Sequence, residues 1–264
     1  MDGAVYDAHC HIHETPAALG VLGDSSVQDV VFCVQATQYT DWDDVLRLHA
    51  RHGERVIPAL GLHPWFIERV LSAEIPPTWP TELRRLLEAH GGVLGECGLD
   101  KAARNPTTRQ PYPFEPQIGV LQTQLSIAHD LGLPVSIHCV RAFGALAEVL
   151  RGTEADATLP PRIMLHSYSG SPDMLQQVFL RGELGRRVYV SFSSIVNGRN
   201  REKSAQCIRA VPADRLLIES DLHDAAAALP ALDEAMALVA SARGWTPSET
   251  RQQVARNSRE FFQL

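Results

Sequence analysis

The sequence predicts an α/β protein that folds as a (β/α)8 barrel, the TIM-barrel architecture. Eight short runs rich in β-branched residues recur along the chain, and each is followed by a longer segment with helical spacing of its apolar residues. Apolar strands that alternate with helices are typical of a parallel sheet covered by helices. The 264 residues suit a single barrel, so we expect one domain over residues 1–264.

Each expected strand is a short apolar run. In chain order they are "AVYDAH" (4–9), "DVVFCV" (29–34), "RVIPAL" (55–60), "GGVLGE" (91–96), "PVSIHC" (134–139), "RIMLHS" (162–167), "RVYVSF" (187–192) and "RLLIES" (215–220). An open doubly wound sheet is the alternative, but it would need a glycine-rich phosphate loop after the first strand. The chain has "HCHIHE" there, so the barrel is favoured.

The expected helices have apolar residues three and four positions apart and often end in glycine. Examples are "TDWDDVLRLHARHG" (40–53), "TELRRLLEAHG" (81–91), "QIGVLQTQLSIAHDLG" (117–132) and "SPDMLQQVFLRG" (171–182). Two proline-rich stretches, "EIPPTWPTE" (74–82) and "ARNPTTRQPYPFEP" (103–116), are interpreted as loops after the third and fourth strands.

Composition excludes several classes of protein. A net charge of −7 argues against a protein that coats DNA or RNA through a basic surface. The five cysteines have no disulfide framework spacing, and the N-terminus has no signal-peptide pattern. The longest apolar tract, residues 224–242, is interrupted by Pro230, Asp233 and Glu234, so we expect no membrane span. We therefore expect a soluble protein of the cytoplasm, with the nucleus as a second compartment.

Polar side chains follow the apolar runs where a barrel carries its chemistry, at the C-terminal ends of the strands. These metal-ligating or acid–base candidates are His9, His11, His63, Glu96, His138, His166, Glu219 and Asp221. His9 and His11 lie two positions apart, so their side chains point to the same side of a strand and can grip one ion.

A single one of these histidines is better explained as a satisfied core or loop residue. Their occurrence at several strand ends makes chance a poor explanation, so a metal site is favoured. Cys10, Cys97 and Cys139 adjoin candidate ligands and should point outward as small buried hydrophobes. Asp7 is interpreted as a carboxylate that supports a ligand, and His13 as a loop residue.

The motifs "DAHCH", "GLHP", "GECGLD", "LPVSIHC", "HSYSG", "SFS" and "LLIESD", followed by "ARNSREFF", resemble the TatD family of metal-dependent hydrolases, within the amidohydrolase-like barrels. The resemblance implies metal ligands at His9, His11, Glu96, His138, His166 and Asp221, with Glu96 bridging two ions. It implies that His63 is a pocket residue near the substrate.

The chain departs from the family pattern in the loops that choose a substrate. His13 stands where the family has an acidic residue, Lys101 where it has an aromatic one, and Leu222 and His223 where it has "SP". Arg141 stands three residues after the strand-five histidine, where the family arginine stands two after it. "GLDKAARNP" and "IHCVRAF" are most similar to a fungal subgroup, one member of which partners a cell-cycle ubiquitin-ligase subunit. A protein partner is therefore compatible with the resemblance.

Four histidines and two carboxylates suit two divalent ions, which the sequence does not identify as Zn²⁺, Mg²⁺ or Mn²⁺. One ion would be held by His9, His11 and Asp221 and the other by His138 and His166, with Glu96 shared. Two metals about 3.5–4 Å apart can activate a water and stabilise both the attacking and the leaving oxygen of a displacement reaction. Asp221 is the candidate general base, and Asp221 and Glu96 are the catalytic candidates.

Basic side chains on the strand-end loops favour an anionic substrate, such as DNA ends. They are Lys101, Arg104, Arg109, Arg141, Arg199, Arg201 and Lys203. We expect Arg141 and Lys101, with His63, to contact the substrate. The preferred hypothesis is an end-acting phosphodiester hydrolase of the deoxyribonuclease type. The alternatives are a hydrolase of another ester, lactone or amide, and a scaffold protein that has kept its metal ions.

Overall fold

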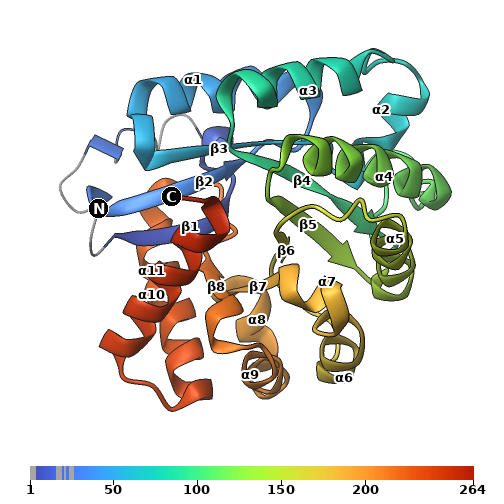
Figure 1. Ribbon diagram of the computed structural model, residues 1–264. Helices are drawn as coiled ribbons and strands as arrows, with labels where there is room; N and C mark the ends of the chain where they lie inside the picture. The colour runs from blue at the N-terminus through green and yellow to red at the C-terminus, as the bar shows by residue number, and fades with distance from the viewer. Residues whose placement is uncertain (1–3, 16–19, 21, 24–26) are drawn as a thin grey trace.

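The computed structural model describes residues 4–15, 20, 22–23 and 27–264, and it confirms the predicted barrel. Eight parallel strands lie in the order β1 to β8 and curl into a nearly closed barrel surrounded by helices (Figure 1). The strands are β1 Val5–Cys10, β2 Val30–Gln35, β3 Val56–Leu60, β4 Val93–Asp100, β5 Val135–Val140, β6 Ile163–Leu165, β7 Val188–Ser193 and β8 Leu216–Glu219. Each overlaps one of the runs expected from the sequence.

The helices follow the strands as expected, with differences at their ends. They are α1 Trp42–His52, α2 Ile67–Leu71, α3 Trp79–His90, α4 Phe114–Leu131, α5 Phe143–Ala155, α6 Pro172–Met174, α7 Gly182–Arg187, α8 Ser194–Asn197, α9 Arg201–Ala210, α10 Ala225–Arg243 and α11 Pro247–Phe262. The loop expected over 74–82 is too long, because α3 already begins at Trp79. Pro80 fits there because the first turn of a helix needs no N–H from that residue.

The ends of β1 and β8 are joined by backbone hydrogen bonds that close the barrel beside the polar cluster. The N–H of Asp221 donates to the carbonyl of His9 at 3.0 Å, and the N–H of His11 donates to the carbonyl of Leu222 at 2.8 Å. These bonds fix the first and last candidate ligands relative to each other, although more than 200 residues separate them along the chain.

Strand β4 is longer than the sequence predicts, and this corrects the position of Glu96. The strand continues to Asp100, so Glu96 lies inside it rather than at its end. Gly98 has φ +151°, and a Cβ there would lie 1.9 Å from the carbonyl oxygen of His138. Glycine therefore lets β4 continue against β5 past Glu96.

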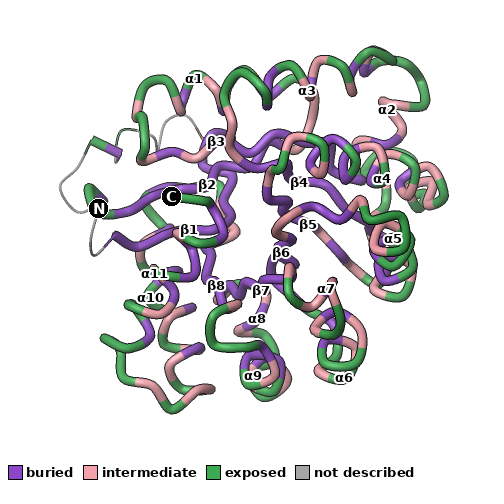
Figure 2. The backbone as a smooth tube through the Cα atoms, in the orientation of Figure 1, coloured by how far each residue is buried: buried purple, intermediate pink, exposed green. Residues whose placement is uncertain are grey.

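The core has two layers. The larger layer lies between the strands and the surrounding helices and contains Cys10, Cys97 and Cys139, which confirms that these cysteines point outward. The smaller layer fills the barrel interior and is closed at its N-terminal end by Phe261 and Phe262 of α11. Figure 2 shows that burial follows the strands while the outer helix faces are exposed.

By length and composition alone, helix α10 is long and apolar enough to cross a membrane. In the structure it contains Pro230 and packs against α9, α11 and β8. Its buried residues form one face, Ala225, Ala228, Ala231, Leu232, Ala235 and Val239. This packing is that of a covering helix of the barrel.

We expect Phe261→Ala to destabilise the protein by about 3–5 kcal/mol, because it leaves a cavity at the closed end of the barrel. Phe261 is fully buried and contacts Tyr189 edge-to-face with ring centroids 5.2 Å apart. Urea unfolding followed by circular dichroism measures the loss. The control Leu71→Ala removes an exposed side chain and should change stability by less than about 0.5 kcal/mol. Equal losses in the two variants would contradict the role given to Phe261.

Candidate metal centre

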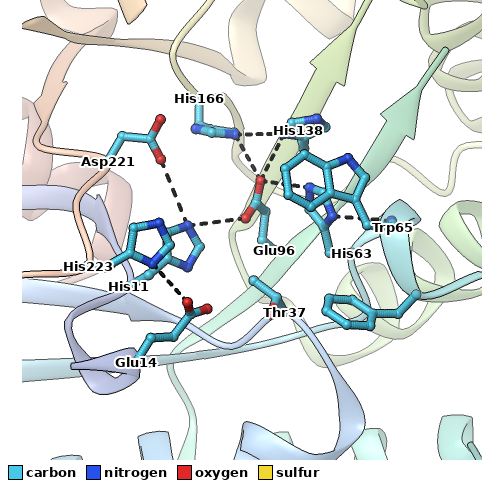
Figure 3. A pocket seen from close by; sticks show the side chains of 11 residues that line it. His11, Glu14, Thr37, His63, Trp65, Glu96, His138, His166, Asp221 and His223 are labelled. Atoms are coloured by element: carbon cyan, nitrogen blue, oxygen red, sulfur yellow. Dashed lines mark hydrogen bonds and ion pairs between the residues drawn. The ribbon is translucent and has the colours of Figure 1, made fainter. Parts of the chain in front are cut away.

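The buried carboxylate of Glu96 lies at the centre of the polar cluster at the C-terminal end of the barrel (Figure 3). Five imidazoles surround it. Its Oε1 faces Nε2 of His63 at 3.4 Å, Nδ1 of His138 at 3.0 Å and Nε2 of His166 at 2.9 Å. Its Oε2 faces Nε2 of His9 at 3.5 Å and Nε2 of His11 at 3.4 Å. The two oxygens of one carboxylate therefore face two different groups of histidines.

The first group lies where β1 meets β8. Nε2 of His9 and Nε2 of His11 are 3.3 Å apart, and both face Oδ1 of Asp221, at 4.0 Å and 3.8 Å. These three side chains, with Oε2 of Glu96, converge on one point. The parity argument for the H-x-H pair thus agrees with the geometry, because both rings point into the same space.

The second group joins β5 and β6. Nδ1 of His138 and Nε2 of His166 are 3.3 Å apart, and both face Oε1 of Glu96. Ligand atoms that lie about 2.0–2.2 Å from a shared ion are roughly 3.0–3.5 Å from one another in tetrahedral or octahedral geometry. The distances in this group have that size, so these residues fit a divalent ion.

The second nitrogen of each imidazole determines whether the first can bind a metal. Nδ1 of His11 donates to the carbonyl of Gln35 at 3.0 Å, which leaves the lone pair of Nε2 free. Nδ1 of His166 donates to Glu219 at 3.3 Å, and Nε2 of His138 donates to Asp100 at 3.3 Å. Partners of this kind orient metal-binding histidines in known sites. The donor chemistry therefore fits the expected metal ions.

His9 is held in a similar way. Its Nδ1 lies 2.9 Å from the hydroxyl of Ser136 on β5, and its ring stacks on that of His166 with centroids 3.9 Å apart. The two rings belong to different groups of ligands. Their contact connects the two halves of the centre.

His63 differs from the other four histidines in its tautomer. The backbone N–H of Trp65 donates to Nδ1 of His63 at 3.2 Å, so neutral His63 carries its proton on Nε2. That Nε2 faces Glu96 as a donor and has no lone pair to offer a metal. This agrees with the expectation that His63 is a pocket residue rather than a ligand.

Electrostatics hold Glu96 ionised. Burial by itself favours the neutral acid, but the imidazoles of His63, His166 and His9 outweigh it and lower the pKa of Glu96 well below its ordinary value. Burial lowers the pKa of His11 to about 3, so this ring is neutral and can bind a metal. Burial also raises the pKa of Asp221, against the opposing effect of His166.

A cavity of about 320 Å³ opens over the cluster. Of the residues singled out in the sequence, His11, His63, Glu96, His138, His166 and Asp221 line it. Neither of the two expected cationic substrate contacts does. Arg141 is exposed with φ +53°, and the ammonium of exposed Lys101 lies 4.1 Å from the ring centroid of Phe114.

The sequence interpretation missed several residues that the fold brings to this site. Asp100 has the strand parity of Glu96 and lies at the end of β4, a signal that was available in the sequence. Trp65 and Glu14 line the cavity, and nothing local distinguishes these two from surface residues. His223, whose loop departs from the family pattern, also lines the cavity, and its Nδ1 lies 2.8 Å from Oε2 of Glu14.

Two interpretations of supporting residues are refined by the contacts. Asp7 does not hold an imidazole, because its carboxylate accepts the backbone N–H of Ser220 at 2.8 Å and the hydroxyl of Ser220. It supports the segment that carries Asp221. Oδ1 of Asp7 also lies 3.4 Å from the backbone N of His9. His13 lies 3.4 Å from Asp41, outside the two groups.

The motif resemblance is confirmed by comparison with known proteins. The family model described as TatD related DNase matches residues 6–263. The Cut9-interacting protein scn1 of Schizosaccharomyces pombe is 27% identical over 99% of each chain. The 3′-5′ ssDNA/RNA exonuclease TatD of Erwinia amylovora is 30% identical over 71% of this chain and 66% of its own. The structure of YjjV, a TatD homologue from Escherichia coli, covers 100% of both chains with a TM-score of 0.77 and 25% identity.

We expect Asp100→Asn to weaken metal binding roughly 10- to 100-fold, because the group in the place of Oδ2 becomes an NH2, which cannot accept from Nε2 of His138. The amide oxygen can still accept the N–H groups of Ala102 and Ala103, so the loop should keep its conformation. Equilibrium dialysis with metal analysis measures the change. The control is Asp130→Asn, which removes an exposed carboxylate paired with Arg84. Unchanged metal affinity in Asp100→Asn would refute the supporting role of Asp100.

Proposed function

We propose that this chain, which belongs to the TatD-related DNase family and is a metal-dependent hydrolase, cleaves phosphodiester bonds at nucleic-acid ends with two divalent ions. One observation carries the proposal: the two oxygens of Glu96 face two separate groups of ligand side chains. A carboxylate in that position suits a bridge between two ions, which is the arrangement of many enzymes that cleave phosphodiesters.

In this proposal His9, His11 and Asp221 hold one ion, His138 and His166 hold the other, and Glu96 is shared. When bound, the ions supply Lewis-acid chemistry that activates a water and stabilises the charge of the displaced oxygen. The candidates are Zn²⁺, Mg²⁺ and Mn²⁺. The four imidazoles favour a transition metal such as Zn²⁺, whereas the carboxylates also suit Mg²⁺ and Mn²⁺.

Asp221 is the proposed general base. It lies at the cavity wall with its side chain 21% exposed, so its free oxygen can reach both substrate and solvent. As the water oxygen bonds to phosphorus and the bond to the leaving oxygen breaks, Asp221 accepts the proton of the water and passes it to solvent. Glu96 keeps the two groups of ligands at a fixed separation, and His63 donates from Nε2 at the cavity wall.

The other two hypotheses are supported less well. A hydrolase of another ester, lactone or amide would use the same centre, since this barrel serves many substrates. A scaffold role agrees with the name of one relative, Cut9-interacting protein, and a protein partner remains part of the proposal. A pure scaffold would have no need for all six side chains to converge as they do. We place the enzyme in the cytoplasm, and also in the nucleus.

The metal-loaded protein should hydrolyse single-stranded oligonucleotides from one end and leave lactones and amides intact. Product ladders on denaturing gels measure this. Asp221→Asn should abolish turnover and keep the circular dichroism spectrum, because the amide cannot accept the proton. The control Asp233→Asn on the exposed part of α10 should act as the wild type. Cleavage of a lactone or amide without any cleavage of oligonucleotides would overturn the proposed substrate class.

Arg141 and Lys101, being outside the cavity, are proposed to contact phosphates further along a longer substrate. Arg141→Ala should therefore raise KM roughly tenfold for a long oligonucleotide, as the loss of a charge-assisted hydrogen bond implies. KM for a dinucleotide should change little, and Arg141→Lys should recover part of the loss. Initial rates on the two lengths measure the difference. Equal KM values for wild type and Arg141→Ala on the long substrate would make Arg141 a surface residue.

A further inference from the structure

Trp65 is a large apolar side chain that lies at the cavity with about half of its surface exposed. Its exposed fraction is 48%, and it follows His63 and Pro64 at the C-terminal end of β3. Exposed large apolar residues that line a cavity mark binding sites more often than chance surface positions do. Of the other exposed large hydrophobics among the described residues, Leu71, Ile195 and Leu264, none lines this cavity.

The indole is held in one orientation despite its exposure. Its Nε1–H donates to Oδ2 of Asp100 at 2.7 Å, and its backbone N–H donates to Nδ1 of His63 at 3.2 Å. Its ring meets that of His63 at 88° with centroids 4.8 Å apart. Figure 3 shows the indole beside His63 and His138 at the cavity. A rigid aromatic surface loses little conformational entropy when a flat group stacks on it.

The hydrogen bonds also fix the distance from the indole to the candidate metal centre. Oδ2 of Asp100, which accepts from the indole, also accepts from Nε2 of His138 at 3.3 Å. The ring centroids of Trp65 and His138 are 6.3 Å apart, so a base stacked on Trp65 would lie beside a phosphate held at the candidate metal centre. The cavity is at the small end of the range of about 300–1,000 Å³ for ligand sites.

The cavity has few positive charges, so contacts to the bases of the substrate matter more there than contacts to its phosphates. No Lys or Arg of the described part of the chain lines it, and the whole protein has a net charge of −7. Proteins that bind single strands combine a basic groove that follows the phosphates with aromatic side chains on which the bases stack. Because no described Lys or Arg lines this cavity, contacts to the base must provide the affinity inside it, whereas Arg141 and Lys101 are proposed to act on phosphates outside it.

We propose that Trp65 is the stacking surface for the nucleobase next to the scissile phosphate. This rests on the proposed phosphodiester hydrolysis and narrows its substrate class to phosphodiesters that carry a base, excluding those of plain sugars or alcohols. Phe66, which also lines the cavity, extends the aromatic surface.

The test compares two single-stranded phosphorothioate oligonucleotides of equal length, which resist hydrolysis and keep one charge per phosphate. One carries bases, and in the other every nucleotide is an abasic tetrahydrofuran unit. Fluorescence anisotropy with the metal-loaded protein measures Kd. Wild type should bind the base-bearing strand roughly 5- to 150-fold more tightly than the abasic one, the range expected for stacking of one base. Trp65→Ala should remove most of this preference without changing the affinity for the abasic strand.

Two further variants separate stacking from a structural role. Trp65→Phe loses the Nε1–H that donates to Asp100 but keeps a ring, so it should retain most of the preference that Trp65→Ala loses. If Trp65 acted only by holding Asp100, the two variants would be equally impaired. Leu71→Ala, an exposed apolar change on the neighbouring helix α2, should bind as the wild type.

Failure of this inference differs from failure of the proposed function. A wild-type protein that cleaves oligonucleotides but binds both strands equally overturns the role of Trp65 and leaves the hydrolytic proposal intact. A preference for bases that Trp65→Ala removes supports the stacking role, even where no oligonucleotide is cleaved and the hydrolytic proposal therefore fails. A preference that survives in Trp65→Ala assigns base recognition to another residue and overturns the inference.

Discussion

The C-terminal end of this barrel depends on one arrangement, in which five imidazoles converge on the buried carboxylate of Glu96. A buried carboxylate without partners would be neutral or would destabilise the fold, so each surrounding ring compensates part of its desolvation. The strands that carry these rings must keep a register that brings every nitrogen to the same point. Small residues beside Glu96, such as Gly98, permit that approach, since a Cβ there would collide with β5.

Hydrogen-bond acceptors in the barrel wall orient the rings that surround Glu96. Asp100, Glu219 and the carbonyl of Gln35 each bind the far nitrogen of one ring and so fix its tautomer. Asp7 accepts the backbone N–H of Ser220, the residue before Asp221. The rings are therefore oriented by the fold itself, which lowers the cost of organising a metal site. At the opposite end the barrel interior is apolar and includes Phe261 and Phe262.

The same contacts place Trp65, the proposed base-binding residue, next to the candidate metal centre. Asp100 binds both the ring of a candidate ligand and the indole at the cavity, so a substrate held at Trp65 lies at a set distance from Glu96. The cavity lacks lysine and arginine among its described lining residues, and its positive potential would come from bound ions. Specificity then depends on the shape and aromatic character of the wall more than on its charge.

Sequence alone determined the fold class, because strand and helix periods and the order of eight strands are local properties of the chain. It also indicated eight candidate side chains for a site, since their residue types follow apolar runs and parallel strands bring their ends to one face. The family resemblance reduced these to the six proposed ligands. Sequence alone could not determine what lies beyond those runs. The length of β4, the hydrogen bonds from Ser220 to Asp7, and the exposure of Trp65 beside Asp100 all depend on contacts between distant segments. Such contacts are decided by packing in three dimensions, which no local pattern encodes.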